Sequence, residues 1–288
     1  MAIVKAESNS HWYLPDGTPF YELDYPETSK ARVFLEWKNN GKQGPRPRMK
    51  ASLRDARKVG ALPSVTNIIS ILEKPQLIAW KVEQGIIAAL TMPDRERQAF
   101  GDDLDALAAK VAQDADETKN AAAKFGSAMH SAIENWIMSS EVPDDATILP
   151  HFEKFVAWWN ENVEEIYWTE QCLVGDGYAG RGDLKARIKG HGVAIVDFKT
   201  RKQDGRGKFA SYDEDGMQLA AYREADMFLD DTGPPAEHCI SLYINSGEPK
   251  PPVLKVWDQE DITRLHRAFL AAKDLWTLIK KYDPQQGA

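Results

Sequence analysis

The chain has 288 residues and a formal net charge of −8 at pH 7. This length is sufficient for one large domain with its own hydrophobic core. Only two cysteines are present, Cys172 and Cys239, which excludes a disulfide framework and a four-cysteine iron–sulfur or zinc site within one chain. No apolar run is long enough to cross a bilayer, and residues 1–10 lack the apolar core of a signal peptide. We therefore expect a cytoplasmic protein with no iron–sulfur cluster and no membrane partner.

The N-terminal part, residues 1–62, is rich in aromatic residues, proline and glycine and lacks helical periodicity, which predicts a small β-rich segment. Two short strands are expected around the turn at Asp16 and Gly17. Residues 42–58 carry the densest positive charge of the chain, which is either a phosphate-binding surface or a solvated face. Its basic residues are Lys42, Arg46, Arg48, Lys50, Arg54, Arg57 and Lys58.

Apolar periodicity predicts that residues 63–138 are mostly helical. One helix is expected to begin near Ser64 or Thr66, which suit an N-cap, and to run through Leu72. Further helices are expected at 77–90, 102–138 and 150–163.

After residue 163 the periodicity changes to that of strands. Three strands joined by glycine-rich turns form a meander, which is followed by a charged loop, a helix, two more strands and a final helix. This order predicts an α/β fold in which helices flank a mixed central sheet. The expected strands are 167–174, 180–188, 193–199, 238–244 and 253–257, and the expected helices are 217–229 and 258–282.

Two aspartates and a lysine lie in the second and third strands of the meander. Asp183 is near the start of the second strand, while Asp197 and Lys199 end the third. Because side chains alternate across a strand, Asp197 and Lys199 share one face and Phe198 takes the other. An exposed ion pair at a strand end is the simple alternative. The apolar residues 193–196 favour a buried strand, whose charged end is costly unless the charges are paired or bind a metal.

These residue types suit the hydrolysis of a phosphodiester. Divalent cations neutralise the phosphate and activate water, and Mg²⁺ prefers carboxylate oxygens and waters as ligands. Asp183 and Asp197 provide the carboxylates for Mg²⁺ or Mn²⁺, and the main-chain carbonyl of Phe198 is a candidate further ligand. Lys199 provides a positive charge where negative charge develops during the reaction.

Glu170 and His130 are candidates to complete the acidic cluster. Glu170 lies on the first strand of the meander and is either a metal-site carboxylate or a solvated strand residue. His130 lies on a helix, with Gly126 and Glu134 one turn away on the same face. It is a candidate metal ligand or phosphate contact, or else a half-buried histidine paired with Glu134. The small Gly126 favours a close approach of this helix to the sheet.

Gln218 and Tyr222 are one helical turn apart, directly after the charged loop. They are candidates to contact a nucleotide or to orient Lys199. In the alternative interpretation, Tyr222 is a core residue and Gln218 a surface residue.

The chain order of these candidates resembles the ordered motifs of the RecB-type branch of the PD-(D/E)XK nucleases. The matching residues are His130, Glu170, Asp183, Asp197-Phe198-Lys199 and Gln218-x-x-x-Tyr222. The region from Pro63 to Lys81 also resembles the helical entry of mitochondrial genome maintenance exonucleases and related phage-encoded nucleases. The resemblance covers residues 60–245 and implies one nuclease domain over 63–288. Its expected parts are a helical arch at 63–138, a restriction-endonuclease-like core at 124–257 and a C-terminal helix at 258–282.

The resemblance implies a Mg²⁺- or Mn²⁺-dependent exonuclease that acts on single-stranded or frayed DNA ends. His130, Asp183 and Asp197 would be metal-site residues, Lys199 catalytic, and the helix of Gln218 and Tyr222 a support for the substrate. A role in phage or host DNA recombination, repair or processing is implied, with a single-strand annealing protein as a candidate partner. Family members with an iron–sulfur cluster have four cysteines, and this chain departs from them.

Basic and aromatic residues provide a candidate lining for DNA. We expect Arg46, Arg48 and Lys50, together with Arg201, Lys202, Arg206 and Lys208, to contact phosphates unless these runs are only solvated faces. Tryptophans are candidates to stack on bases, with a place in the core as the alternative: Trp12, Trp80 and Trp136.

Two other functions remain open. A structure-specific or defence endonuclease on the same core differs from an exonuclease in needing no free end. A catalytically silent DNA-binding recombination subunit is the alternative outside the enzymes. The presence of Asp183, Asp197 and Lys199 argues against the silent subunit.

Overall fold

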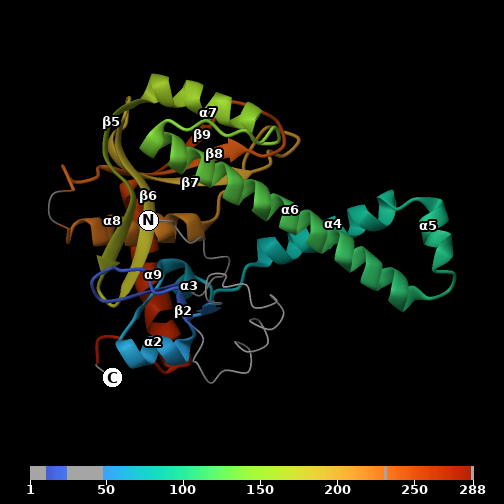
Figure 1. Ribbon diagram of the computed structural model, residues 1–288, viewed down its shortest axis with the longest axis horizontal. Coiled ribbons are helices and arrows are strands. Elements are labelled where there is room, and N and C mark those ends of the chain that lie inside the picture. Colours follow the sequence, from blue (N-terminus) through green and yellow to red (C-terminus); the bar gives the residue numbers. More distant parts are fainter. Residues whose placement is uncertain (1–10, 25–47, 230–231, 287–288) are drawn as a thin grey trace, which may run out of the picture.

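The computed structural model describes residues 11–24, 48–229 and 232–286, and its centre is a five-stranded sheet (Figure 1). β7 and β8 pair in parallel, and the other neighbouring strands pair antiparallel. The fold is α/β with a mixed sheet flanked by helices, as predicted, and is compatible with a restriction-endonuclease-like core. In sheet order, the strands are β5 (Val163–Gly175), β6 (Tyr178–Ile188), β7 (Gly192–Arg201), β8 (His238–Asn245) and β9 (Val253–Trp257).

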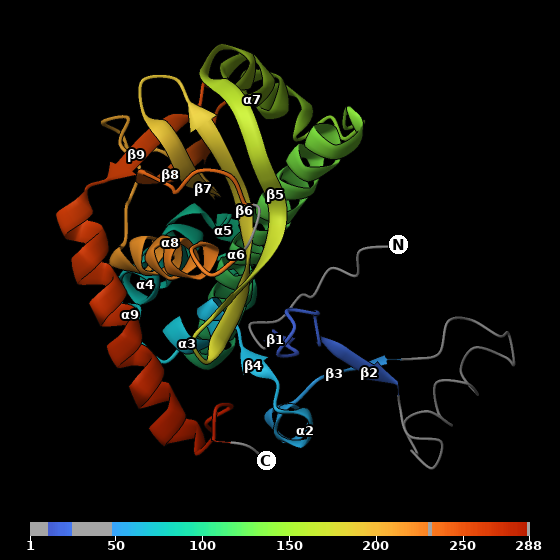
Figure 2. The ribbon, with the colours of Figure 1, turned by 90° about the vertical axis from the view of Figure 1, so that its left-hand side faces the viewer.

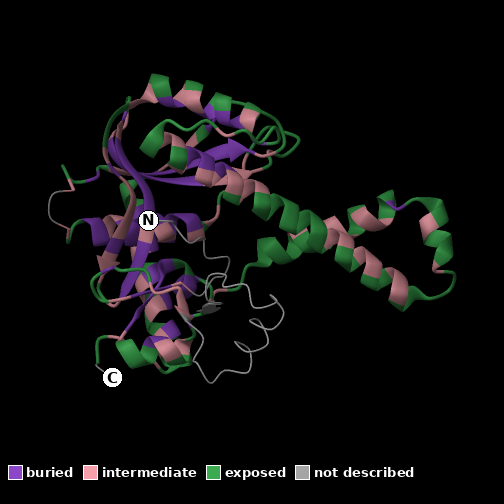
Figure 3. Ribbon diagram, in the orientation of Figure 1, coloured by how far each residue is buried: buried purple, intermediate pink, exposed green. Residues whose placement is uncertain are grey.

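Helices cover both faces of the sheet (Figure 2). Leu184 and Val196 point into a core cluster formed with α6 and α7, whereas Ile195 and Cys239 point into a cluster formed with α3, α8 and α9. Alternation of side chains along each strand produces this division, and Figure 3 shows the sheet as the most buried part of the molecule. The helices are α3 (Val65–Ile69), α6 (Leu104–Ser139), α7 (Leu149–Asn162), α8 (Asp213–Asp226) and α9 (Gln259–Lys280).

Two element boundaries differ from the prediction in ways that have a physical reason. β5 begins directly after α7, four positions before the predicted start at residue 167, because the chain passes from helix to strand without a loop. α8 begins at Asp213 rather than at residue 217. Its first turn is acidic, with Glu214 and Asp215 beside Asp213, and negative charge near a helix N-terminus is stabilising.

Short strand pairs form the N-terminal part of the described chain. The hairpin expected around Asp16 and Gly17 is reduced to an isolated bridge between Tyr13 and Pro19. Its first strand instead pairs with a distant segment that leads into α3, which ties the N-terminal part to the core. The antiparallel pairs are β1 (Trp12–Tyr13) with β4 (Leu62–Pro63), and β2 (Glu22–Asp24) with β3 (Arg48–Lys50).

The segment expected to be β-rich also contains a helix, α2 (Leu53–Val59). The Ser52 hydroxyl accepts a hydrogen bond from the Asp55 amide, and the Asp55 carboxylate accepts one from the Ser52 amide. This capping box starts the helix, which ends at Gly60 with a left-handed φ of 64°. Part of the basic run therefore lies on a helix, and Arg46 lies outside the described residues.

An arm of three helices projects away from the sheet (Figure 1). It consists of α4 (Pro75–Thr91), α5 (Asp94–Ala99) and the first part of α6. These helices extend outward from the sheet in Figure 1. The arch expected over 63–138 stays a prediction. α6 is one continuous helix of 36 residues that links the arm to the sheet. Across the described residues, no helix is long and apolar enough to span a bilayer.

A buried ion pair joins the sheet to α8. Lys185 of β6 lies 2.5 Å from an Asp226 oxygen, and both side chains are almost fully buried. The Trp168 indole nitrogen donates a hydrogen bond of 2.8 Å to the other Asp226 oxygen. Because both charges have partners, the pair is tolerated in a low-dielectric environment.

We expect Asp226→Ala to lower the free energy of unfolding by about 3–5 kcal/mol, because it leaves the Lys185 ammonium buried without a counter-charge. Urea denaturation followed by circular dichroism measures the change. The matched control is Glu248→Ala, which removes one partner of the exposed pair Lys250–Glu248 and should change stability little. An equal loss of unfolding free energy in the two variants would contradict the idea that an unpaired buried charge costs more than an unpaired exposed one.

Candidate metal centre

Three carboxylates stand at the same level of three neighbouring strands. The β6–β7 ladder ends at the pair Leu184–Val196, and Asp183 and Asp197 occupy the next position on each strand. On the other side of β6, the β5–β6 register places Glu170 opposite Asp183. The site therefore lies where the backbone ladder is interrupted and the strands separate.

Glu170 has an unusual backbone conformation, with a left-handed φ of 49°. Its neighbours Thr169 and Gln171 both remain paired with β6, so only Glu170 turns out of the ladder. The Thr169 hydroxyl donates a hydrogen bond of 3.1 Å to the main-chain oxygen of Asp183. A left-handed conformation costs about 1–2 kcal/mol for a residue with a side chain, and such strain concentrates at functional sites.

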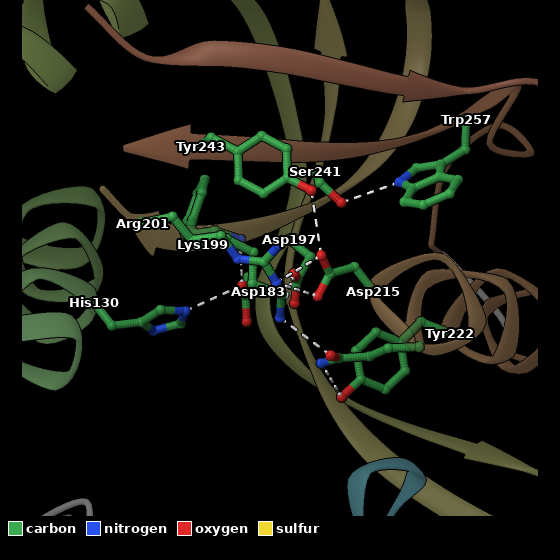
Figure 4. A network of polar contacts seen from close by, with 12 residues as sticks. His130, Asp183, Asp197, Lys199, Arg201, Asp215, Tyr222, Ser241, Tyr243 and Trp257 are labelled. Atoms are coloured by element: carbon green, nitrogen blue, oxygen red, sulfur yellow. Dashed lines mark hydrogen bonds and ion pairs between the residues drawn. The ribbon is translucent and has the colours of Figure 1, made fainter. Parts of the chain in front are cut away.

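His130 reaches the carboxylates from α6 (Figure 4). Its Nε2 lies 3.1 Å from Asp183 Oδ2, and its Nδ1 lies 3.7 Å from Glu170 Oε1. α6 can approach this closely because residue 126 is glycine: a Cβ there would lie 2.8 Å from the Thr200 hydroxyl oxygen. The sequence prediction of a close approach at Gly126 is therefore confirmed.

Glu134 does not pair with His130, so the structure contradicts that alternative. Glu134 Oε1 instead lies 3.0 Å from a terminal nitrogen of Arg181, whose Nε lies 2.7 Å from Glu170 Oε2. Arg181 was not among the predicted site residues, although it stands two positions before Asp183. It supplies the second positive charge beside the acidic group.

Burial and mutual repulsion shift the ionisation of these groups. Burial, and then the Asp183 charge, raise the pKa of Glu170 to about 7. Burial alone would lower the pKa of His130, but its contact with Asp183 and the charge of Glu170 raise it to about 9. Burial opposes ionisation of Asp183 as well, yet the nearby His130 charge holds the Asp183 pKa below its ordinary value. Without a metal, His130 therefore acts as the counter-charge of the cluster.

Asp197 and Lys199 form a contact of 2.6 Å between the carboxylate Oδ2 and the ammonium. Lys199 is thus the direct counter-charge of this buried carboxylate. Burial raises the pKa of Asp197 to about 7, with Lys199 opposing the shift and Asp183 adding to it. The predicted placement of Asp197 and Lys199 on one face is confirmed, since the Phe198 ring packs on the opposite face against Phe155.

A short chain of hydrogen bonds fixes Lys199 from α8. Its ammonium donates to Gln218 Oε1 at 3.1 Å, and the Gln218 amide nitrogen donates to the Tyr222 hydroxyl at 3.2 Å. Tyr222 is also a buried core residue, as the alternative interpretation expected, and its contact with a nucleotide stays a prediction. The geometry supports the hypothesis that Gln218 orients Lys199.

The Phe198 amide donates a hydrogen bond of 2.7 Å to Asp183 Oδ2, the same oxygen that contacts His130. This bond fixes the Asp183 carboxylate relative to β7. The role of the Phe198 carbonyl as a ligand stays a prediction.

The predicted DNA-contacting residues lie in different environments. The Arg201 guanidinium binds Asp215 at 2.8 Å, and its contact with phosphate stays a prediction. Lys202 and Lys50 are exposed. Of the tryptophans, Trp12 is buried in the core and Trp136 packs edge-to-face against Phe152, Phe155 and Trp159, whereas Trp80 lies on the arm.

His130, Glu170 and Asp183 together could hold a metal ion. One nitrogen or oxygen atom from each lies within 4.8 Å of the others. Their donor set of one imidazole and two carboxylates suits Mn²⁺, and its oxygens suit Mg²⁺. Asp197 lies outside this group of three, and its carboxylate Oδ2 contacts Lys199. His130, Glu170 and Asp183 were all among the predicted metal-site candidates, and the role of Asp197 as a ligand stays a prediction.

Comparisons with known proteins add little to this geometry. No family model matches the chain, and no curated protein matches it. Among solved structures, the chain is similar to one described as "Crystal structure of SSO0001", with 18% sequence identity and a TM-score of 0.24. The alignment covers 50% of this chain and 71% of that chain. A TM-score this low carries no argument about function.

We expect Asp183→Asn to weaken Mn²⁺ binding by more than about tenfold, since it removes ligand charge without removing volume. Isothermal titration calorimetry on the metal-free protein measures the affinity. Glu164→Gln is the matched control, because Glu164 is an exposed carboxylate on the same strand as Glu170 and should leave binding unchanged. Undiminished Mn²⁺ affinity in Asp183→Asn would exclude this group as the metal centre.

Proposed function

We propose that the protein is a metal-dependent DNA nuclease. The observation that carries the proposal is the row of Glu170, Asp183 and Asp197 across three neighbouring strands, with His130 on one side and Lys199 on the other. Buried carboxylates that lie this close repel one another and favour a bound divalent cation. Hydrolysis of a phosphodiester requires such a cation and a positive charge held near the reacting phosphate.

Each residue of the row has a distinct role in the proposed reaction. A divalent cation held by His130, Glu170 and Asp183 would neutralise phosphate charge and lower the pKa of a bound water. Burial alone would lower the pKa of Lys199, but the charges of Asp197, Asp215 and Asp183 together raise it above its ordinary value, so the ammonium stays protonated. Lys199 therefore offers a fixed positive charge for the negative charge that develops on the phosphate. Its contacts with Asp197 and Gln218 hold it in place.

DNA as the substrate follows from the resemblance of the ordered motifs to the RecB-type nucleases. The exonuclease form of the activity, the preference for single-stranded or frayed ends and the annealing-protein partner rest on the same resemblance. The exposed Lys50 and Lys202 are available for phosphate contacts. The net charge of −8 confines such contacts to local basic surfaces.

A structure-specific or defence endonuclease is the second candidate, and one observation favours it. α4 and α5 extend away from the body (Figure 1). An arm in this position favours a site that a strand can reach without a free end. The two candidates share the metal centre and differ only in access to it.

We expect Lys199→Ala to reduce Mg²⁺-dependent cleavage by at least about 100-fold while the protein remains folded, because it removes a charge that acts in the transition state. Cleavage of end-labelled single- and double-stranded DNA, resolved by length, measures the loss and the polarity. Lys250→Ala removes an exposed lysine between β8 and β9 and serves as the control. Activity of Lys199→Ala within a few-fold of wild type, with Mg²⁺ in excess, would contradict the assigned role.

Circular single-stranded DNA separates the exonuclease from the endonuclease. If the enzyme requires a free end, the circle survives under conditions that degrade the same molecule after linearisation, and bulky blocks on both termini protect the linear form. Gel analysis of both substrates over time gives the answer. Efficient cutting of the circle would favour the endonuclease and leave the metal centre unaffected.

A further inference from the structure

A group of aromatic side chains lies beside Lys199. Tyr243 of β8 is the register partner of Lys199 on β7, so the two residues stand at the same level of adjacent parallel strands. The Phe209 ring stacks on the Tyr243 ring with centroids 5.4 Å apart and an interplanar angle of 18°. Phe209 belongs to the loop between β7 and α8, which therefore returns to the site after leaving it.

Arg201 holds this aromatic group in place. Its guanidinium lies 4.4 Å from the centroid of the Tyr212 ring and 5.3 Å from that of Tyr243. The same guanidinium binds both Asp215 oxygens, and the Tyr243 hydroxyl donates to Asp215 at 3.2 Å (Figure 4). Arg201 is thus a positioning residue for Tyr212 and Tyr243, and its charge is already compensated by Asp215.

The loop that carries Phe209 is ordered by its own hydrogen bonds. The Asp204 carboxylate accepts from the amides of Arg206 and Lys208 at 2.9 and 2.8 Å, and Arg206 also pairs with Asp204 through its side chain. Lys202 and Lys208 are exposed, and neither ammonium forms an ion pair with another described residue. The loop therefore presents two available positive charges beside an aromatic ring.

The position of these rings is not explained by the hydrophobic core. Phe209, Tyr212 and Tyr243 belong to none of the three core clusters of the described chain. Phe209 and Tyr212 are only partly buried, so each retains accessible ring surface. Aromatic rings interleaved with lysines next to a charged centre are the combination that binds single-stranded nucleic acid: the rings stack on bases and the lysines follow the phosphates.

We propose that Phe209, supported by Tyr243, Tyr212 and Arg201, is a stacking platform for an unpaired nucleobase of the DNA strand next to the phosphate that is cut. The inference rests on the proposed nuclease function and deepens it, because it makes single-stranded DNA the bound form. A base inside a duplex is already stacked on its neighbours, so only an unpaired base can use the platform. Lys202 and Lys208 contact the backbone of the same strand.

The test compares the binding of two single strands of equal length in Ca²⁺, an oligothymidylate and a strand of abasic residues. We expect Phe209→Leu to weaken binding of the oligothymidylate by about 5- to 150-fold, the range that stacking of one base supplies. Binding of the abasic strand should stay within about twofold, because the basic contacts are intact. Phe209→Trp keeps an aromatic face and should retain oligothymidylate binding. Fluorescence anisotropy of labelled strands measures all affinities.

Two results would overturn the platform: unchanged oligothymidylate affinity in Phe209→Leu, or equal losses on both strands. Equal losses would mean that the substitution disturbs the loop rather than a base contact. The thermal unfolding midpoint of each variant provides an independent check of folding. The platform is tested by DNA binding, whereas the proposed nuclease function is tested by cleavage. Absence of Mg²⁺- or Mn²⁺-dependent cleavage by the wild-type protein would contradict the nuclease function and would leave the binding result unaffected.

Discussion

Repulsion between like charges governs the arrangement around the end of the β5–β6–β7 ladder. Glu170, Asp183 and Asp197 stand opposite one another in a setting that is largely closed to water. Positive groups from separate elements offset this repulsion: His130 from α6, Arg181 from β6 and Lys199 from β7. The close approach of α6 brings His130 to the carboxylates, and α8 holds Lys199 in place through Gln218.

Much of the fold could be predicted because buried positions recur as apolar residues at the period of a strand or a helix. The apolar residues 193–196 and the alternating positions of β6 identify strands that are covered on both faces. The direction of the arm produces no comparable pattern of apolar residues. Residues 75–91 contain many apolar side chains, yet α4 has no buried residue. The pattern that predicted a helix therefore gave no information about what the helix covers.

The candidate site was predictable where residue type and spacing define it, as for Asp183, Asp197, Lys199 and Gln218. It was not predictable where a contact depends on three-dimensional arrangement. The pairing of Arg201 with Asp215 joins the end of β7 to the first turn of α8, and no spacing rule connects the two residues. The contacts of Arg181 with Glu134 and Glu170 likewise join three separate elements, and residue spacing does not reveal them.

At Glu170 the residue that would make the fold most stable differs from the residue that the proposed metal site needs. Glycine adopts this conformation at no steric cost and would also remove one of the crowded negative charges. Selection for a more stable fold therefore favours glycine at residue 170, whereas selection for a charged metal site favours glutamate. A laboratory screen that rewards thermal stability alone would accept the loss of this carboxylate. Survival of glutamate under drift would then be a sign that the chemistry, rather than the fold, is under selection.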